Sequence, residues 1–139
     1  MTKRKNGARE IAADVGTGRT SAVETAQAAL ARIEDARALN AVVTIDPART
    51  FADAAAVDNR VRGGEIMPLA GVPIVVKDNI WVGGWRVTQG SRLFADFIAP
   101  QDAIAIARLR QAGAALSLPG GGGRYRYSSA VPSHPVAGR

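Results

Sequence analysis

The strongest constraint on the fold is a short apolar run at residues 72–76, Val-Pro-Ile-Val-Val, bounded by Gly71 and by Lys77-Asp78-Asn79. β-Branched residues in an uninterrupted apolar run are typical of a strand that is buried on both faces, as in parallel sheets. Pro73 stands near the start of the run, where a missing backbone donor is tolerated. The pattern therefore predicts a buried strand over residues 72–76, with Lys77 at its carboxyl end.

Helical patterns precede this run. Ser21 and Glu24 have the spacing of a capping box, and an apolar stripe then continues to about Arg37 at steps of three and four residues. Asp46-Pro47 is an N-cap followed by proline at the first helical position, and Gly63-Gly64 is a typical stop. The patterns predict helices over about 21–37 and 46–62.

Weaker signals fill the rest of the region before residue 117. They predict a short helix over 9–15, an extended segment over 41–45, a long loop over 80–100, a helix capped by Asp102 and ended by Gly113, and a strand beginning at 114–116. Helices that alternate with short apolar strands indicate the α/β class. We expect helices packed on a small, incomplete mixed sheet that is part of a larger fold.

The character of the sequence changes after residue 116. The last 21 residues, 119–139, hold five glycines, three prolines and three arginines, with no acidic residue and no helical or strand period. Such a composition buries too little apolar surface to offset its backbone entropy. We expect a folded domain over 1–116 and an unstructured tail over 117–139.

The net charge of +6 comes from the chain ends. Residues 11–123 hold eleven basic and eleven acidic side chains, so no basic face is indicated there, and nucleic-acid binding is disfavoured. The chain has no cysteine and one histidine, His134, which argues against thiolate or histidine metal sites, and we expect no cofactor. No apolar run approaches the ~20 residues that cross a bilayer, and no secretory signal is visible, so we expect a cytoplasmic protein without a membrane partner.

Lys77 is the candidate for chemistry, because it is the sole lysine outside the first five residues and follows a predicted strand. α/β folds place reacting groups at the carboxyl ends of strands. Burial there would disfavour the charged ammonium, and a neutral amine can act as a general base, which an arginine cannot. The alternative is a lysine that simply extends into solvent.

The residues from Pro68 to Asn79, Pro-Leu-Ala-Gly-Val-Pro-Ile-Val-Val-Lys-Asp-Asn, resemble the N-terminal motif of the amidase signature family. The resemblance continues through Thr88-Gln89-Gly90-Ser91, 100–103 and 107–114, and spans roughly 9–116. It implies a carbon–nitrogen hydrolase that acts on small-molecule amides through a nucleophilic serine, a bridging serine and a lysine. By motif, Lys77 matches that lysine; Asp78 and Asn79 match the motif without an assigned step.

The resemblance ends near Ser117, and no later segment matches the glycine- and serine-rich stretch that carries the family's two serines. We therefore expect a truncated or frame-shifted product that is inactive alone. Ser91 lacks a nucleophile-elbow pattern and is interpreted as a turn residue, and Trp81 and Trp85 as loop anchors. The alternative function is a non-catalytic binding module that uses its basic termini on an acidic partner. The resemblance does not separate stand-alone hydrolases from transamidating subunits, and the sequence indicates no particular oligomeric state.

Overall fold

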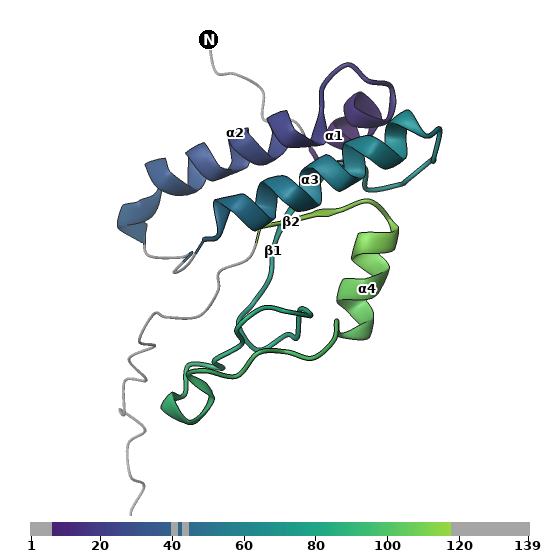
Figure 1. Ribbon diagram of the computed structural model, residues 1–139. Helices are drawn as coiled ribbons and strands as arrows, with labels where there is room; N and C mark the ends of the chain where they lie inside the picture. The colour runs from purple at the N-terminus through teal and green to yellow at the C-terminus, as the bar shows by residue number, and fades with distance from the viewer. Residues whose placement is uncertain (1–6, 40–41, 43–44, 118–139) are drawn as a thin grey trace, which may run out of the picture.

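Two short parallel strands, β1 (Pro73–Val75) and β2 (Ala115–Ser117), lie between two layers of the fold. The computed structural model describes residues 7–39, 42 and 45–117. Figure 1 shows helices α1 (Ala8–Gly16), α2 (Ala22–Asp35) and α3 (Pro47–Arg62) on one side of the strands, and helix α4 (Ile104–Gln111) with a long loop on the other. This arrangement confirms the α/β class.

The side chains of the two strands contribute to two separate hydrophobic cores. Ile74 pairs with Leu116 and Val75 with Ser117. Ala115 packs in a cluster with buried residues of the three helices, whereas Leu116 packs with Val76, Trp85 and other residues of the loop and α4. Successive residues of a strand point to opposite faces, so one short strand serves both cores. Among the described residues the strands run parallel, with a single antiparallel bridge between Arg86 and Ile98 in the loop.

The predicted helix starts at Ser21 and Asp46 are confirmed. The Ser21 hydroxyl accepts a hydrogen bond from the Glu24 N–H, and the Glu24 carboxylate accepts one from the Ser21 N–H. Asp46 accepts from the Arg49 N–H, and α3 begins at Pro47. Short 3-10 helices follow α2 (η1, Arg37–Leu39) and lie in the long loop (η2, Arg92–Phe94).

Asp102 does not cap α4, contrary to the sequence-based prediction. The N-cap residue is Ala103, which makes no side-chain hydrogen bond. The Asp102 carboxylate instead accepts hydrogen bonds from the Gly83 N–H at 2.7 Å and from Arg110 Nε at 3.0 Å. A charged donor and a loop amide outcompete the local capping bond, because charge-assisted hydrogen bonds are the stronger ones.

The strand around Ile74 is shorter and less buried than predicted. It covers 73–75, and Val75 is 49% exposed. Within the part of the chain that the structure describes, β1 pairs with β2 alone, and Val75, unlike Ile74 and Val76, packs in neither of the two buried clusters. The extended segment predicted at 41–45 lies largely outside the described residues, and Val42 and Ile45 belong to no strand. The tail predicted at 117–139 lies outside them from residue 118 onward, and the domain boundary at 116 stays a prediction.

Candidate functional site

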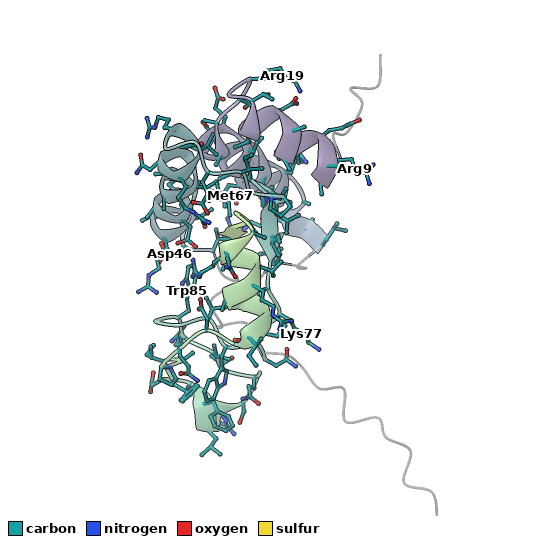
Figure 2. The ribbon with its side chains drawn as sticks, turned by 90° about the vertical axis from the view of Figure 1, so that its right-hand side faces the viewer. Arg9, Arg19, Asp46, Met67, Lys77 and Trp85 are labelled. Atoms are coloured by element: carbon teal, nitrogen blue, oxygen red, sulfur yellow. The ribbon has the colours of Figure 1, made fainter. Side chains whose placement is uncertain are left out.

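Lys77 lies two residues beyond the last paired residue of β1, at the end of the sheet where the carboxyl ends of both strands lie. We call this end of the sheet its carboxyl edge. Val75 pairs with Ser117, so parallel pairing brings the carboxyl ends of β1 and β2 to the same edge. The Lys77 side chain is exposed, and Figure 2 shows it on the side of the molecule opposite Asp46. Within the described residues, the Lys77 ammonium makes no hydrogen bond or ion pair. The structure confirms the strand-end position, but the described residues do not bury the amine.

A turn and a carboxylate hold the backbone around Lys77. The Lys77 carbonyl accepts a hydrogen bond from the Ile80 N–H at 3.0 Å, which closes a turn directly after the strand. The Asp78 carboxylate accepts from the Thr88 N–H at 2.9 Å and from the Thr88 hydroxyl. Asp78 therefore joins the end of β1 to a part of the loop that lies ten residues further along the chain.

The contacts of Asp78 and Thr88 are what sequence reasoning missed at this site. The motif gives Asp78 no step, and Thr88 enters the sequence-based prediction only as part of the family resemblance. A signal existed in the sequence: Thr88 precedes Gln89-Gly90, and a glycine in a long loop is typical of a turn. A tight turn in a long loop needs an anchor for its backbone groups, and an acidic residue after the strand could have supplied it.

Ser91 and the two tryptophans have structural roles here. The Ser91 hydroxyl accepts from the Leu93 N–H at 3.2 Å and caps η2, in agreement with its interpretation as a turn residue. Trp85 is buried in the second core beneath the Arg49 guanidinium, whose carbon lies 5.2 Å from the ring centroid. Trp81 is 37% exposed and contacts Phe97, with ring centroids 5.4 Å apart. Trp85 thus anchors the loop, whereas Trp81 does so only in part.

The space beside Lys77 is small. The recess that its side chain helps to line has a volume of about 10 Å³, which is close to the room that one water needs. The described residues therefore do not enclose a substrate cavity at this edge of the sheet.

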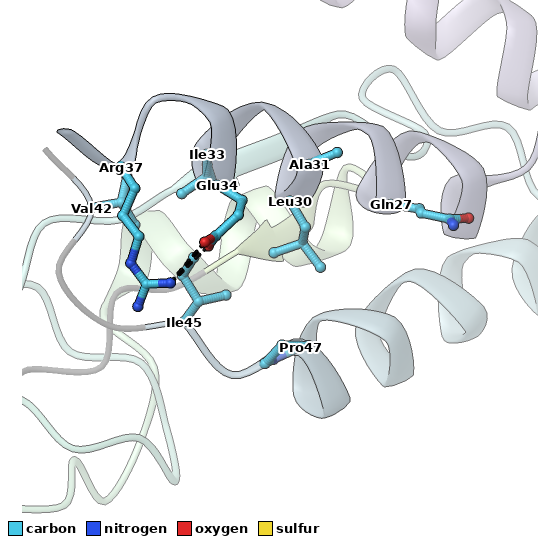
Figure 3. A pocket seen from close by; sticks show the side chains of 9 residues that line it. All are labelled: Gln27, Leu30, Ala31, Ile33, Glu34, Arg37, Val42, Ile45 and Pro47. Carbon is cyan, nitrogen blue, oxygen red and sulfur yellow. Dashed lines mark hydrogen bonds and ion pairs between the residues drawn. The ribbon is translucent and has the colours of Figure 1, made fainter. Parts of the chain in front are cut away.

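A larger groove lies elsewhere, between the carboxyl end of α2 and the start of α3. Figure 3 shows it beside the Arg37–Glu34 ion pair, in which Arg37 Nη1 and Glu34 Oε1 are 2.8 Å apart. Its volume is about 640 Å³, and it is lined by Gln27, Leu30, Ala31, Ile33, Glu34, Arg37, Val42, Ile45 and Pro47. Among the described residues that line the groove there is no hydroxyl or thiol nucleophile, and its one carboxylate, Glu34, is ion-paired with Arg37. We therefore place the candidate site at Lys77 despite the difference in size.

No group of three or more His, Cys, Asp or Glu side chains within the described ranges is arranged to hold a metal ion. None of the described helices is long and apolar enough to cross a membrane.

Comparison with known proteins identifies the family. The sequence model of the Amidase family matches residues 24–117, which is more than half of the 139-residue chain and includes Lys77 and its strand. The chain belongs to the amidase family. The family resemblance noted from the motif around Lys77 is thereby confirmed.

Relatives of known sequence and structure match most of the chain. A glutamyl-tRNA(Gln) amidotransferase subunit from Deinococcus radiodurans is 46% identical over 109 residues, which is 78% of this chain and 22% of that protein. The peptide amidase of Stenotrophomonas maltophilia has 30% identity and a TM-score of 0.74 over 82% of this chain and 24% of its own. A structure from a vestigial protein complex, described in connection with the origins of an s-triazine catabolic enzyme, has 35% identity and a TM-score of 0.74 over 81% of this chain and 25% of its own. The chain thus spans about a quarter or less of each of these relatives.

Proposed function

We propose that residues 24–117 form the lysine-bearing part of an amide-bond hydrolase, with Lys77 as the general base of a Ser–Ser–Lys site. The observation that carries the proposal is the position of Lys77 at the shared carboxyl edge of β1 and β2, inside the segment that matches the family. Groups at this edge of an α/β sheet can converge on one substrate. The exposed, unpaired amine is accessible to groups that approach this edge from outside the described residues.

In this mechanism the Lys77 amine takes a proton from the nucleophilic serine through the bridging serine. The serine oxygen attacks the amide carbonyl carbon, the carbon–nitrogen bond breaks, and the leaving amine receives the proton. Water then hydrolyses the acyl-enzyme and restores the serine. A base must come within hydrogen-bond reach of the proton that it accepts, and an arginine at position 77 would stay protonated.

We assign neither serine of the site to a residue of this chain, because no segment of it matches the glycine- and serine-rich stretch of the family. The chain alone then lacks the nucleophile and the donors that stabilise the tetrahedral intermediate. Loss of one such donor lowers the rate by about 10²–10³-fold, and loss of the nucleophile lowers it much further. The purified chain is expected to hydrolyse no amide.

The test has two parts. The chain alone is assayed with glutamine, a peptide C-terminal amide and an anilide, and enzyme-dependent turnover that Lys77→Ala abolishes would overturn the expected inactivity. In the second part, residues 24–117 replace the matching segment of the Stenotrophomonas maltophilia peptide amidase. Lys77→Arg should abolish hydrolysis by the chimera, whereas Arg108→Ala, which changes an exposed cation on α4, should not.

Thermal unfolding of each chimera is recorded beside the assay, so that a lost activity is separated from a lost fold. A folded Lys77→Arg chimera that retains its hydrolysis rate would contradict the role of Lys77 as general base.

A further inference from the structure

Lys77 makes no contact that anchors its ammonium within the part of the chain that the structure describes. A lysine side chain has several rotatable bonds, and a free one samples many rotamers. The position of the Lys77 backbone is therefore the main constraint on where the amine reaches. Catalytic groups must be held closely, because a displacement of about 1 Å can lower a rate by about 10²-fold.

Asp78, the residue after Lys77, accepts hydrogen bonds on three of its oxygen atoms. The Asp78 carboxylate oxygens accept from the N–H and from the hydroxyl of Thr88, and the Asp78 carbonyl accepts from the Gln89 N–H at 3.2 Å. Thr88 is buried, at 8% exposure, and its hydroxyl oxygen also accepts from the Gly90 N–H at 3.2 Å. Hydrogen bonds to a carboxylate that are shielded from water are among the strong ones in proteins.

The loop has an unfavourable backbone conformation at Gln89, next to these hydrogen bonds. Gln89 has a φ of 53°, which is in the left-handed region that side-chain-bearing residues seldom adopt. Such a conformation persists where the surrounding contacts over-determine it. Those contacts are the hydrogen bonds that the Gln89 N–H donates to the Asp78 carbonyl and the Gly90 N–H donates to the Thr88 hydroxyl oxygen.

We infer that Asp78 and Thr88 are positioning residues that hold the backbone of Lys77 at the end of β1. The inference rests on the proposed function of Lys77 as general base, and it assigns the two residues no contact with substrate. It predicts that loss of the Asp78–Thr88 contact loosens Lys77 while the strands and helices stay ordered.

The experiment measures backbone ¹⁵N order parameters in the full 139-residue chain. Asp78→Ala, which removes both bonds from Thr88, should lower the order parameter of Lys77 from about 0.85 to below about 0.6, with Ile74 and the α2 backbone unchanged. Thr88→Val removes the hydroxyl and keeps the backbone N–H bond, so it should lower the value by a smaller amount. Thr88→Ser keeps the hydroxyl and should restore the value at Lys77. Asp96→Ala is the matched control, because Asp96 is an exposed carboxylate of the same loop.

An unchanged order parameter at Lys77 in Thr88→Val would overturn the inference, and so would a uniform loss of order in β1 and α2 or a failure of Thr88→Ser to restore Lys77. If Asp78→Ala unfolds the chain, the order parameters of Lys77 in Thr88→Val and Thr88→Ser test the inference instead. The order parameters are measured on a chain that need not hydrolyse any amide. An active Lys77→Arg chimera would therefore refute the proposed function while leaving these order parameters as expected.

Discussion

The backbone N–H of Gly71 donates a hydrogen bond to the carbonyl oxygen of Gly113 over 2.9 Å, two residues before each strand begins. Both glycines have left-handed backbone angles, with φ of 65° at Gly71 and 90° at Gly113. A Cβ atom at Gly71 would lie 2.8 Å from Val15 Cγ2 and 3.0 Å from Ala22 Cα. The glycine pair thus sets the register of the parallel strands where no larger residue fits.

Gly71→Ala is expected to lower the free energy of unfolding by about 2–4 kcal/mol, from the left-handed backbone penalty and the contact with α1 and α2. The measurement is urea unfolding followed by circular dichroism. Gly64→Ala is the matched control: its φ is 84°, but nothing lies within 4 Å of the added Cβ. Equal destabilisation by the two substitutions would show that the steric contact at Gly71 has no effect.

Asp58→Ala is expected to destabilise the chain by about 1–3 kcal/mol, since it leaves donors at the start of α2 unsatisfied. The Asp58 carboxylate accepts from the Ala22 N–H at 2.6 Å and from the Val23 N–H at 3.2 Å, and Ala22 is fully buried. Asp96→Ala, which removes an exposed carboxylate, should change the free energy of unfolding by less than about 0.5 kcal/mol. A similar effect of both variants in urea unfolding would refute the role of Asp58.

Acid is expected to weaken the capping box of α2. The hydrogen bond from the Ser21 backbone N–H lowers the pKa of Glu24 from its ordinary value of 4.5, with the Thr20 and Ser21 side chains acting in the same direction. A carboxylate with a lowered pKa stabilises the fold above its unfolded pKa, and this stabilisation is lost as the pH falls through the folded pKa. Carboxyl ¹³C titration should place the Glu24 midpoint below 4.5 in the folded chain and near 4.5 in urea.

Glu24→Gln is the control for this pH dependence, because the amide keeps an acceptor and does not titrate. The variant should lose less stability than the natural chain between pH 5 and the folded midpoint. Identical acid-unfolding curves for the two chains would contradict the assignment.

Lys77→Ala is expected to leave the free energy of unfolding within about 0.5 kcal/mol of the natural value, because the side chain is exposed and unpaired within the described residues. Leu116→Ala removes a fully buried side chain from the second core and should lower it by about 2–5 kcal/mol. Differential scanning calorimetry of both variants checks the contrast. A large loss of stability in Lys77→Ala would mean that the lysine has a structural role instead.

Local sequence patterns were sufficient for the helix starts at Ser21 and Asp46, and for the position of Lys77 after a strand. Each depends on groups within a few residues of one another, since a capping box joins positions three apart and the strand before Lys77 is indicated by a continuous apolar run of five residues. The lysine-bearing motif also identified the family, which the match over 24–117 confirms.

Only the tertiary structure determined which hydrogen-bond partner each of several carboxylates has. Asp102 has the sequence setting of a helix cap but binds Arg110 and Gly83, while Asp58 reaches from α3 to the start of α2 and Asp78 to Thr88. These partners are 8 to 36 residues apart, a separation that no local periodicity encodes. The burial of Val75 and of the Lys77 amine likewise depends on the tertiary structure, because a side chain on a strand is shielded from solvent only where other chain segments cover it.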